Sequence, residues 1–113
     1  MKIGIDIRSA CGEKRGKGWY TFHLVKELLA ANSKAEEKNE YILYAEKLCG
    51  EAAKFHGAHI KVLKKRGALW HLSALGAIKR DKIDVFFAPT SFIIPAFLPA
   101  HIKSVITIHD LVA

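Results

Sequence analysis

The residues with the clearest chemical potential stand near the end of the chain, at His109-Asp110. They directly follow a run of apolar and β-branched residues, 104–108, which predicts a strand. Near neutral pH, a histidine at a strand end can donate a hydrogen bond to a sugar hydroxyl or a phosphate, or accept one. The alternative is a histidine whose ring is satisfied by backbone groups at the strand terminus. Both interpretations stay open on these residues alone.

A glycine-containing segment, Gly16-Lys17-Gly18, precedes the first long amphipathic stretch. Glycine lets the backbone approach a ligand closely, and a helix N-terminus offers free N–H groups to an anion. The dinucleotide fingerprint GxGxxG would need a glycine at position 21, where this chain has Thr21. The pattern therefore argues against an NAD site of the Rossmann type. It leaves a phosphate-binding loop or an ordinary surface loop over residues 9–18.

Two further clusters are weaker candidates. His56 and His59 are three residues apart, a spacing that fits neither an i, i+4 helical pair nor a zinc module, so no metal site is predicted. Trp19 and Tyr20 follow the basic residues of segment 14–17, and such a mixture of aromatic and basic residues can bind nucleic acid. No known nucleic-acid-binding module accompanies them, so no nucleic-acid partner is predicted.

Hydrophobic periodicity predicts the elements that must position these residues. Alternating or short apolar runs predict five strands, at residues 2–8, 41–45, 60–63, 84–89 and 104–108. Apolar residues three and four apart predict helices over 19–31 and 68–80. The second is predicted to pack through Leu69, Leu72, Leu75 and Ile78, on a face that Trp70, Ala74 and Ala77 broaden. Residues 9–18 and 91–100 are predicted to be loops.

This alternation of strands and helices predicts an α/β fold, with a Rossmann-like, mostly parallel sheet of about five strands flanked by helices. In such sheets ligands bind beyond the carboxyl ends of the strands. We therefore expect the glycine segment, the loop from Pro89 to Pro99 and His109-Asp110 to meet at one edge.

Length and composition limit the class of protein. The chain has 113 residues and 26% charged residues, and half of its residues are hydrophobic. These values predict a single folded domain. The net charge of +7 suits anionic partners such as lipid headgroups, nucleic acid or phosphorylated small molecules. The basic clusters at Lys14-Arg15, Lys64-Lys65-Arg66 and Lys79-Arg80 fit a solvated surface equally well.

The sequence also predicts a cytoplasmic location. No apolar run approaches the ~20 residues of a membrane-spanning helix. Asp6 interrupts the first apolar run, which argues against a signal peptide. Cys11 and Cys49 form no CxxC pair and are predicted to be two reduced thiols.

Four stretches form an ordered series along the whole chain. They are the opening strand 2–8 with its Asp-x-Arg, Gly16–Tyr20 with its Gly-x-Gly-x-Tyr, residues 40–44, and the run from Asp84 to Leu111 that ends in Thr-x-His-Asp-Leu. In this order and spacing the chain resembles the N-terminal, acceptor-side domain of family 4 (group 1) glycosyltransferases, which have the two-domain GT-B architecture.

The resemblance implies that residues 1–113 are a partial Rossmann-like N-terminal domain, and that the donor-binding C-terminal domain lies outside this chain. The whole enzyme would move a sugar from a nucleotide-diphosphate sugar to an acceptor hydroxyl, with retention and without a bound metal or other cofactor. The chain alone would be inactive. The catalytic positions implied are His109 and Asp110; the donor- or acceptor-binding positions implied are Gly16, Lys17, Gly18 and Tyr20.

Other functions and partners compete with this expectation. The chain could be a stand-alone basic α/β binding module for phosphorylated ligands or anionic surfaces. As part of a transferase, its basic residues would suit peripheral contact with the inner face of a membrane that carries a lipid-linked acceptor. The apolar last strand, around residues 105–108, could also pair with a second copy and form a homodimer through an exposed sheet edge.

Overall fold

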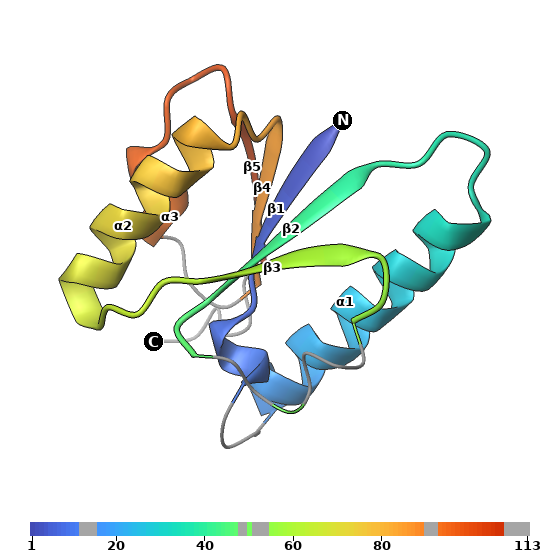
Figure 1. The fold of residues 1–113 in the computed structure, drawn as a ribbon. Helices are drawn as coiled ribbons and strands as arrows, with labels where there is room; N and C mark the ends of the chain where they lie inside the picture. Colours follow the sequence, from blue (N-terminus) through green and yellow to red (C-terminus); the bar gives the residue numbers. More distant parts are fainter. Residues whose placement is uncertain (12–15, 48–49, 51–54, 90–92, 108–113) are drawn as a thin grey trace.

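A computed structural model of the chain shows a five-stranded parallel sheet with helices on both faces (Figure 1). It describes residues 1–11, 16–47, 50, 55–89 and 93–107. The strands are β1 (Lys2–Asp6), β2 (Glu40–Ala45), β3 (Ala58–Val62), β4 (Val85–Ala88) and β5 (Lys103–Ile106). They stand in the order β3-β2-β1-β4-β5, and every neighbouring pair is parallel. The predicted fold class is confirmed.

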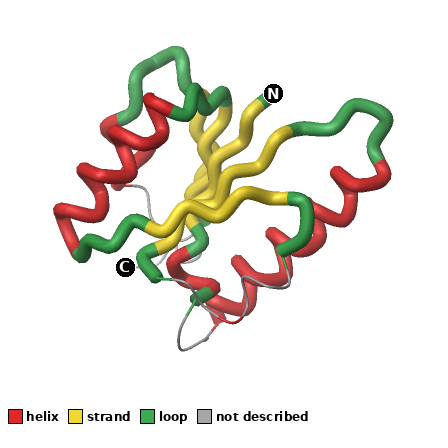
Figure 2. The backbone as a smooth tube through the Cα atoms, in the orientation of Figure 1, coloured by secondary structure: helices red, strands yellow, loops and turns green. Residues whose placement is uncertain are grey.

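The helices divide between the two faces of the sheet (Figure 2). They are the 3-10 turn η1 (Arg8–Ala10), and the α-helices α1 (Gly16–Lys34), α2 (Gly67–Arg80) and α3 (Ile93–Phe97). The core on the α1 side includes Ile5, Ile7, Phe22, Val25, Leu29 and Leu43. The core on the other side includes Tyr44, Trp70, Ala74, Ile78, Phe86 and Ile94.

The first strand shows how the sequence pattern builds these two cores. Ile3, Ile5 and Ile7 pack on the α1 side, as their alternation predicts. Gly4 faces the other side, where a Cβ atom would lie 3.0 Å from Tyr44 Cε2. The strand ends at Asp6, earlier than predicted, because the chain turns so that the backbone N–H of Arg8 donates to the Asp6 carboxylate at 3.0 Å.

The glycine segment is helical, so the prediction of a loop over residues 9–18 is wrong at its end. Gly16, Lys17 and Gly18 form the first turn of α1. Glycine costs a helix interior about 1 kcal/mol relative to alanine. The packed residues further along α1, such as Phe22 and Val25, fix the helix axis and outweigh that cost.

The predicted loop over residues 91–100 also contains a helix, α3. Pro95 is the third residue of this short helix. The first N–H groups of a helix have no intrahelical acceptor, so a proline there loses no hydrogen bond. Proline in the sequence predicts a loop here, but a proline in the first turn is compatible with a helix.

The packed face of α2 is narrower than the predicted one, which wrongly included Leu69 and Leu72. Leu69 and Leu72 are 60% and 65% exposed, whereas Trp70, Ala74, Ala77 and Ile78 are buried. A step of three residues falls short of a full helical turn by about 60°. A stripe of leucines at steps of three therefore winds around the helix, from solvent at Leu69 to the core at Ile78.

A polar network ties the end of α2 to the sheet. The Tyr44 hydroxyl donates to Asp81 Oδ2 at 2.8 Å, and the Lys61 ammonium donates to Asp81 Oδ1. Burial and then the hydrogen bond to Asp81 raise the pKa of the Tyr44 hydroxyl. Burial alone would raise the pKa of the Asp81 carboxyl, but the hydrogen bonds from Lys61 and Tyr44 outweigh it and lower that pKa.

The structure contradicts the prediction of a reduced thiol at Cys11, which is disulfide-bonded. The other cysteine of the chain, Cys49, lies outside the described residues. The prediction relied on a large sequence separation. Parallel strands bring segments that are far apart in sequence to the same edge of a sheet, so that separation says little about distance.

Candidate functional site

The order of the strands marks one place at the carboxyl edge of the sheet. The chain builds outward from β1 to β2 and β3, then returns to place β4 and β5 on the other side of β1. In open α/β sheets, the crevice beyond the strand ends at such a reversal is where ligands bind. Here the reversal lies between β1 and β4. The candidate site therefore lies where η1 follows β1 and α1 begins.

An ion pair is held rigidly at the end of β1. Asp6 is 2% exposed, and its carboxylate accepts Arg8 Nε–H at 3.0 Å and Arg8 Nη2–H at 2.8 Å. The guanidinium also stacks on Trp70, with Arg8 Cζ 3.8 Å from the ring centroid. The Trp70 indole is itself fixed, because its N–H donates to the Ala45 carbonyl at 3.2 Å. The bidentate pair with Asp6 and the stacking on Trp70 thus hold the guanidinium in one orientation.

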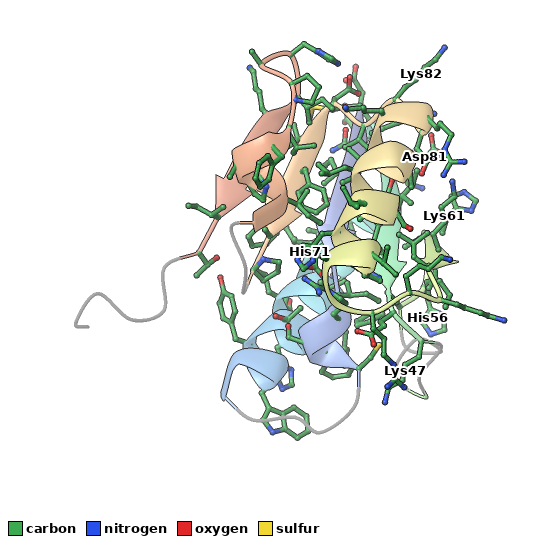
Figure 3. All side chains as sticks on the ribbon, turned by 90° about the vertical axis from the view of Figure 1, so that its left-hand side faces the viewer. Lys47, His56, Lys61, His71, Asp81 and Lys82 are labelled. Carbon is green, nitrogen blue, oxygen red and sulfur yellow. The ribbon has the colours of Figure 1, made fainter. Side chains whose placement is uncertain are left out.

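His71 extends this arrangement from α2 (Figure 3). Its Nδ1 lies 2.9 Å from the Gly67 carbonyl oxygen, and its Nε2 lies 3.4 Å from Arg8 Nη2. A carbonyl oxygen can only accept, so Nδ1 carries the hydrogen. In the neutral ring, Nε2 then accepts from Arg8.

The start of α1 also contacts the carboxyl end of the edge strand β5. The Tyr20 hydroxyl lies 3.1 Å from Thr107 Oγ1, just beyond β5. Thr21, the next residue of α1, contacts η1: the Ser9 hydroxyl donates to Thr21 Oγ1 at 2.8 Å, and Thr21 is fully buried. These contacts join η1, α1 and the end of β5 although their residues are up to 87 positions apart.

The positions implied by the resemblance are only partly described. Gly16 is exposed and Gly18 is buried in the first turn of α1, and Lys17 contributes its backbone to that turn. Tyr20 is 37% exposed and contacts Thr107. The catalytic positions, His109 and Asp110, lie outside the described residues.

None of Asp6, Arg8, Trp70 and His71 is predicted from the sequence to be a site residue. Trp70 and His71 stand more than 60 positions from Arg8 and are predicted only as part of a helix. Their role depends on α2 packing across the end of β1, which no local pattern reports. The local signal that existed was the Asp-x-Arg itself, since a buried acid two residues from an arginine can form a bidentate pair.

An apolar groove opens beside His71, between α2 and α3. It has a volume of about 550 Å³. Its lining comprises Gly67, Ala68, His71, Leu72, Leu75 and Phe97. His71 is thus shared by the groove and by the Arg8 cluster, so a ligand with an anionic end and an apolar body could contact both.

Among the residues that the structure describes, no group of three or more histidine, cysteine, aspartate or glutamate side chains is placed to hold a metal ion. Within those same residues, no helix combines the length and the apolar character that crossing a bilayer requires.

Comparison of the chain with protein-family models, with curated proteins and with solved structures found no match. The geometry of the site residues is therefore the basis for a proposed function.

Proposed function

We propose that this chain is the acceptor-side part of a GT-B glycosyltransferase that moves a sugar from a nucleotide-diphosphate sugar to an acceptor hydroxyl. One observation carries the proposal. The Tyr20–Thr107 contact, at 3.1 Å, joins the start of α1 to the end of β5 at the carboxyl edge of the sheet. Tyr20, which ends the Gly-x-Gly-x-Tyr stretch, thus contacts Thr107, the first residue of the Thr-x-His-Asp-Leu stretch.

The proposed roles follow the chemistry of each group. Backbone N–H groups of Gly16 and Gly18, in the first turn of α1, would bind the donor phosphate or the transferred sugar. Lys17 would add positive charge beside them, and Tyr20 would hold this turn against Thr107. His109 would hydrogen-bond the sugar near the reacting carbon, and Asp110 would support that segment.

The reaction breaks the bond between the anomeric carbon and the diphosphate oxygen and forms a bond from that carbon to the acceptor oxygen. The proton of the acceptor hydroxyl passes to the leaving diphosphate. The leaving diphosphate gains negative charge as its bond to carbon breaks. Preorganised donors at that edge stabilise this charge, and fixed positions for both substrates lower the entropic barrier. We propose Arg8 as one such donor, since Asp6 and Trp70 hold its guanidinium in place.

The test begins with the intact mass of the protein isolated from its source cells. We expect a mass well above the 12.6 kDa of this chain. We also expect that protein to transfer sugar from a panel of nucleotide sugars, and the 113-residue chain alone to transfer none. A mass of 12.6 kDa, or transfer from no member of the panel, would overturn the proposal in favour of a stand-alone binding module.

A matched pair of variants then tests the site. His109→Ala should reduce transfer on the order of a hundredfold or more, because it removes a transition-state hydrogen bond. His101→Ala changes the same residue type at an exposed position that borders a hollow with Met1 and Asp84. We expect it to leave transfer unchanged. Equal rates for the two variants would contradict the role of His109.

A further inference from the structure

Helix α2 is unusual for a surface helix because its first twelve residues, from Gly67 to Ile78, include no charged side chain. Charges stand at both of its ends instead. Lys64-Lys65-Arg66 precede the helix, and Lys79 and Arg80 form its last turn. The helix has 14 residues, which corresponds to a length of about 21 Å.

The helix is apolar on its outer side as well as on its packed side. Trp70, Ala74, Ala77 and Ile78 are buried against the sheet. Leu69 and Leu72, on the other side, are 60% and 65% exposed. Phe97 of α3, which is 69% exposed, borders the same groove as Leu72. Three large apolar side chains are therefore presented to solvent on one face of the molecule.

Basic side chains cluster at the N-terminal end of α2, beside this apolar face. Lys47, Lys64, Lys65 and Arg66 line a second hollow, together with one acid, Glu46. Arg66 Nε lies 3.7 Å from Glu46 Oε1, so this acid offsets one of the four cations. Figure 3 shows Lys47 near the start of α2 and Asp81 and Lys82 beyond its other end. The face thus combines exposed apolar tips with unbalanced positive charge.

We propose that this face, formed by α2, Phe97 and the preceding Lys64-Lys65-Arg66, docks on the surface of an anionic lipid bilayer. Leu69, Leu72 and Phe97 would enter the boundary between headgroups and acyl chains, and α2 would lie along the surface. The lysine stems would lie against the apolar layer while their ammonium groups bind anionic headgroups.

Charge decides between this partner and a second copy of the chain. A symmetric dimer through this face would bring the basic cluster of one copy near that of the other. Glu46 is the one acid among the described residues that line the basic hollow, and it already pairs with Arg66. A soluble acidic protein would satisfy the lysines but has no general need for three exposed apolar tips. A bilayer uses both features at once.

Vesicle flotation tests the proposal with the 113-residue chain and two lipid compositions. One vesicle contains phosphatidylcholine alone, and the other contains equal parts phosphatidylcholine and phosphatidylglycerol. We expect binding to the second composition only, and weaker binding as salt is raised. Each lysine near an anionic surface contributes about a fivefold change in binding constant. The double variant Lys64→Gln/Lys65→Gln should therefore bind about thirtyfold more weakly.

The apolar contribution needs its own variant. Leu72→Glu should abolish flotation by placing a charge where the side chain enters the lipid. Because Leu72 is exposed, the fold should survive, which circular dichroism checks. If that variant fails to fold, Leu69→Glu takes its place. Matched controls on or near α1, Ala31→Glu for the leucine and Lys34→Gln/Lys38→Gln for the lysines, change exposed residues and should bind as the wild type does.

Each result has one meaning. Loss of binding in the variants of this face, with retention in the controls, supports the proposal. The proposal is overturned if Leu72→Glu and Leu69→Glu bind as well as the wild type. It is also overturned if polyglutamate releases bound protein from the vesicles as readily as added anionic vesicles do, because binding then depends on charge alone. Absence of binding to either vesicle overturns it as well. Sugar transfer is not measured in this experiment, so its failure leaves the proposed function standing.

Discussion

At the scale of single residues, a few side chains set the geometry of both cores and of the candidate site. Gly4 admits two aromatic rings close to the backbone of β1, and the Asp6–Arg8 pair shapes the end of that strand. Gly4 lies against residues distant in sequence, Tyr44 and Phe86, and the Arg8 guanidinium stacks on the equally distant Trp70. Substitution at these positions is therefore more informative than substitution on the exposed surface.

Gly4→Ala tests the close approach at β1. The new Cβ would lie 3.0 Å from Tyr44 Cε2 and 3.3 Å from Phe86 Cδ1, and both rings are fully buried. Because such rings have little room to move, we expect a loss of about 1–3 kcal/mol in the free energy of unfolding, measured by urea denaturation. In Gly76→Ala the Cβ meets no atom within 4 Å, so that variant should gain up to about 1 kcal/mol from helix propensity.

Arg8→Lys tests whether the guanidinium at the site is specifically required. A lysine keeps the charge but loses the bidentate geometry and the stacking on Trp70. Asp6, at 2% exposure, would keep a poorly satisfied charge. We expect a loss of about 3 kcal/mol in the free energy of unfolding. Arg80→Lys, at an exposed position, should change stability by less than about 0.5 kcal/mol. Similar losses for both variants would contradict a specific role for Arg8.

At the scale of elements, the two ends of α2 make different contacts. Its beginning carries the apolar groove and His71, and its end is fastened to β2 and β3 through Asp81. The helix can thus present an apolar outer side without detaching from the sheet, because its buried face and its C-terminal network both hold it.

The Asp81 network predicts a pH dependence of stability. Hydrogen bonds from Lys61 and Tyr44 lower the pKa of Asp81 in the folded chain below the ordinary value of 3.8. The carboxylate therefore stabilises the fold fully above that ordinary value, and this contribution is lost as pH falls through the lowered pKa. Asp81→Asn should lower the free energy of unfolding by about 1–2 kcal/mol at neutral pH.

The control is the acid part of the stability curve. Urea denaturation between neutral and acid pH should show the difference between Asp81→Asn and the wild type shrinking below the ordinary pKa of 3.8. Asp84→Asn is the matched variant, because Asp84 is exposed and its Oδ2 accepts from the Lys2 backbone N–H at 2.8 Å. We expect this variant to change stability less than Asp81→Asn does. A difference for Asp81→Asn that stays constant with pH would contradict the assignment.

At the scale of the whole molecule, the sheet is covered unevenly. Its centre lies between α1 on one face and α2 with α3 on the other, whereas β5 stands at one edge with all four residues exposed. Val105 and Ile106 are 49% and 45% exposed. Exposed apolar edge strands pair readily with other strands.

We expect this edge to cause self-association, which light scattering across a dilution series measures. The wild-type chain should form a dimer at high concentration, and Val105→Lys should shift it to monomer, because charge on an edge strand opposes pairing. Leu69→Lys makes the same kind of change on α2 and should leave the dimer intact. A monomer at every concentration would show that β5 does not associate.

Periodicity in the sequence determined the class of the fold. The five strands were predicted within a few residues because alternating or continuous apolar runs depend only on which faces of a strand are buried. The two long helices were also predicted, although α1 begins three residues earlier than expected. Of the candidate site, the sequence indicated the carboxyl edge of the sheet, and it marked the Asp-x-Arg only as part of the resemblance. The roles of His109 and Asp110 remain predictions.

Only the tertiary structure decided which surfaces meet. The stacking of Arg8 on Trp70 and the contact of Tyr20 with Thr107 join segments that are distant in sequence, and Cys11 is disulfide-bonded. It also decided that Leu69 and Leu72 face solvent, since a helix buries the side that its neighbours cover. Local pattern reports the period of an element, but its rotation and partners are set by the free energy of packing the whole chain.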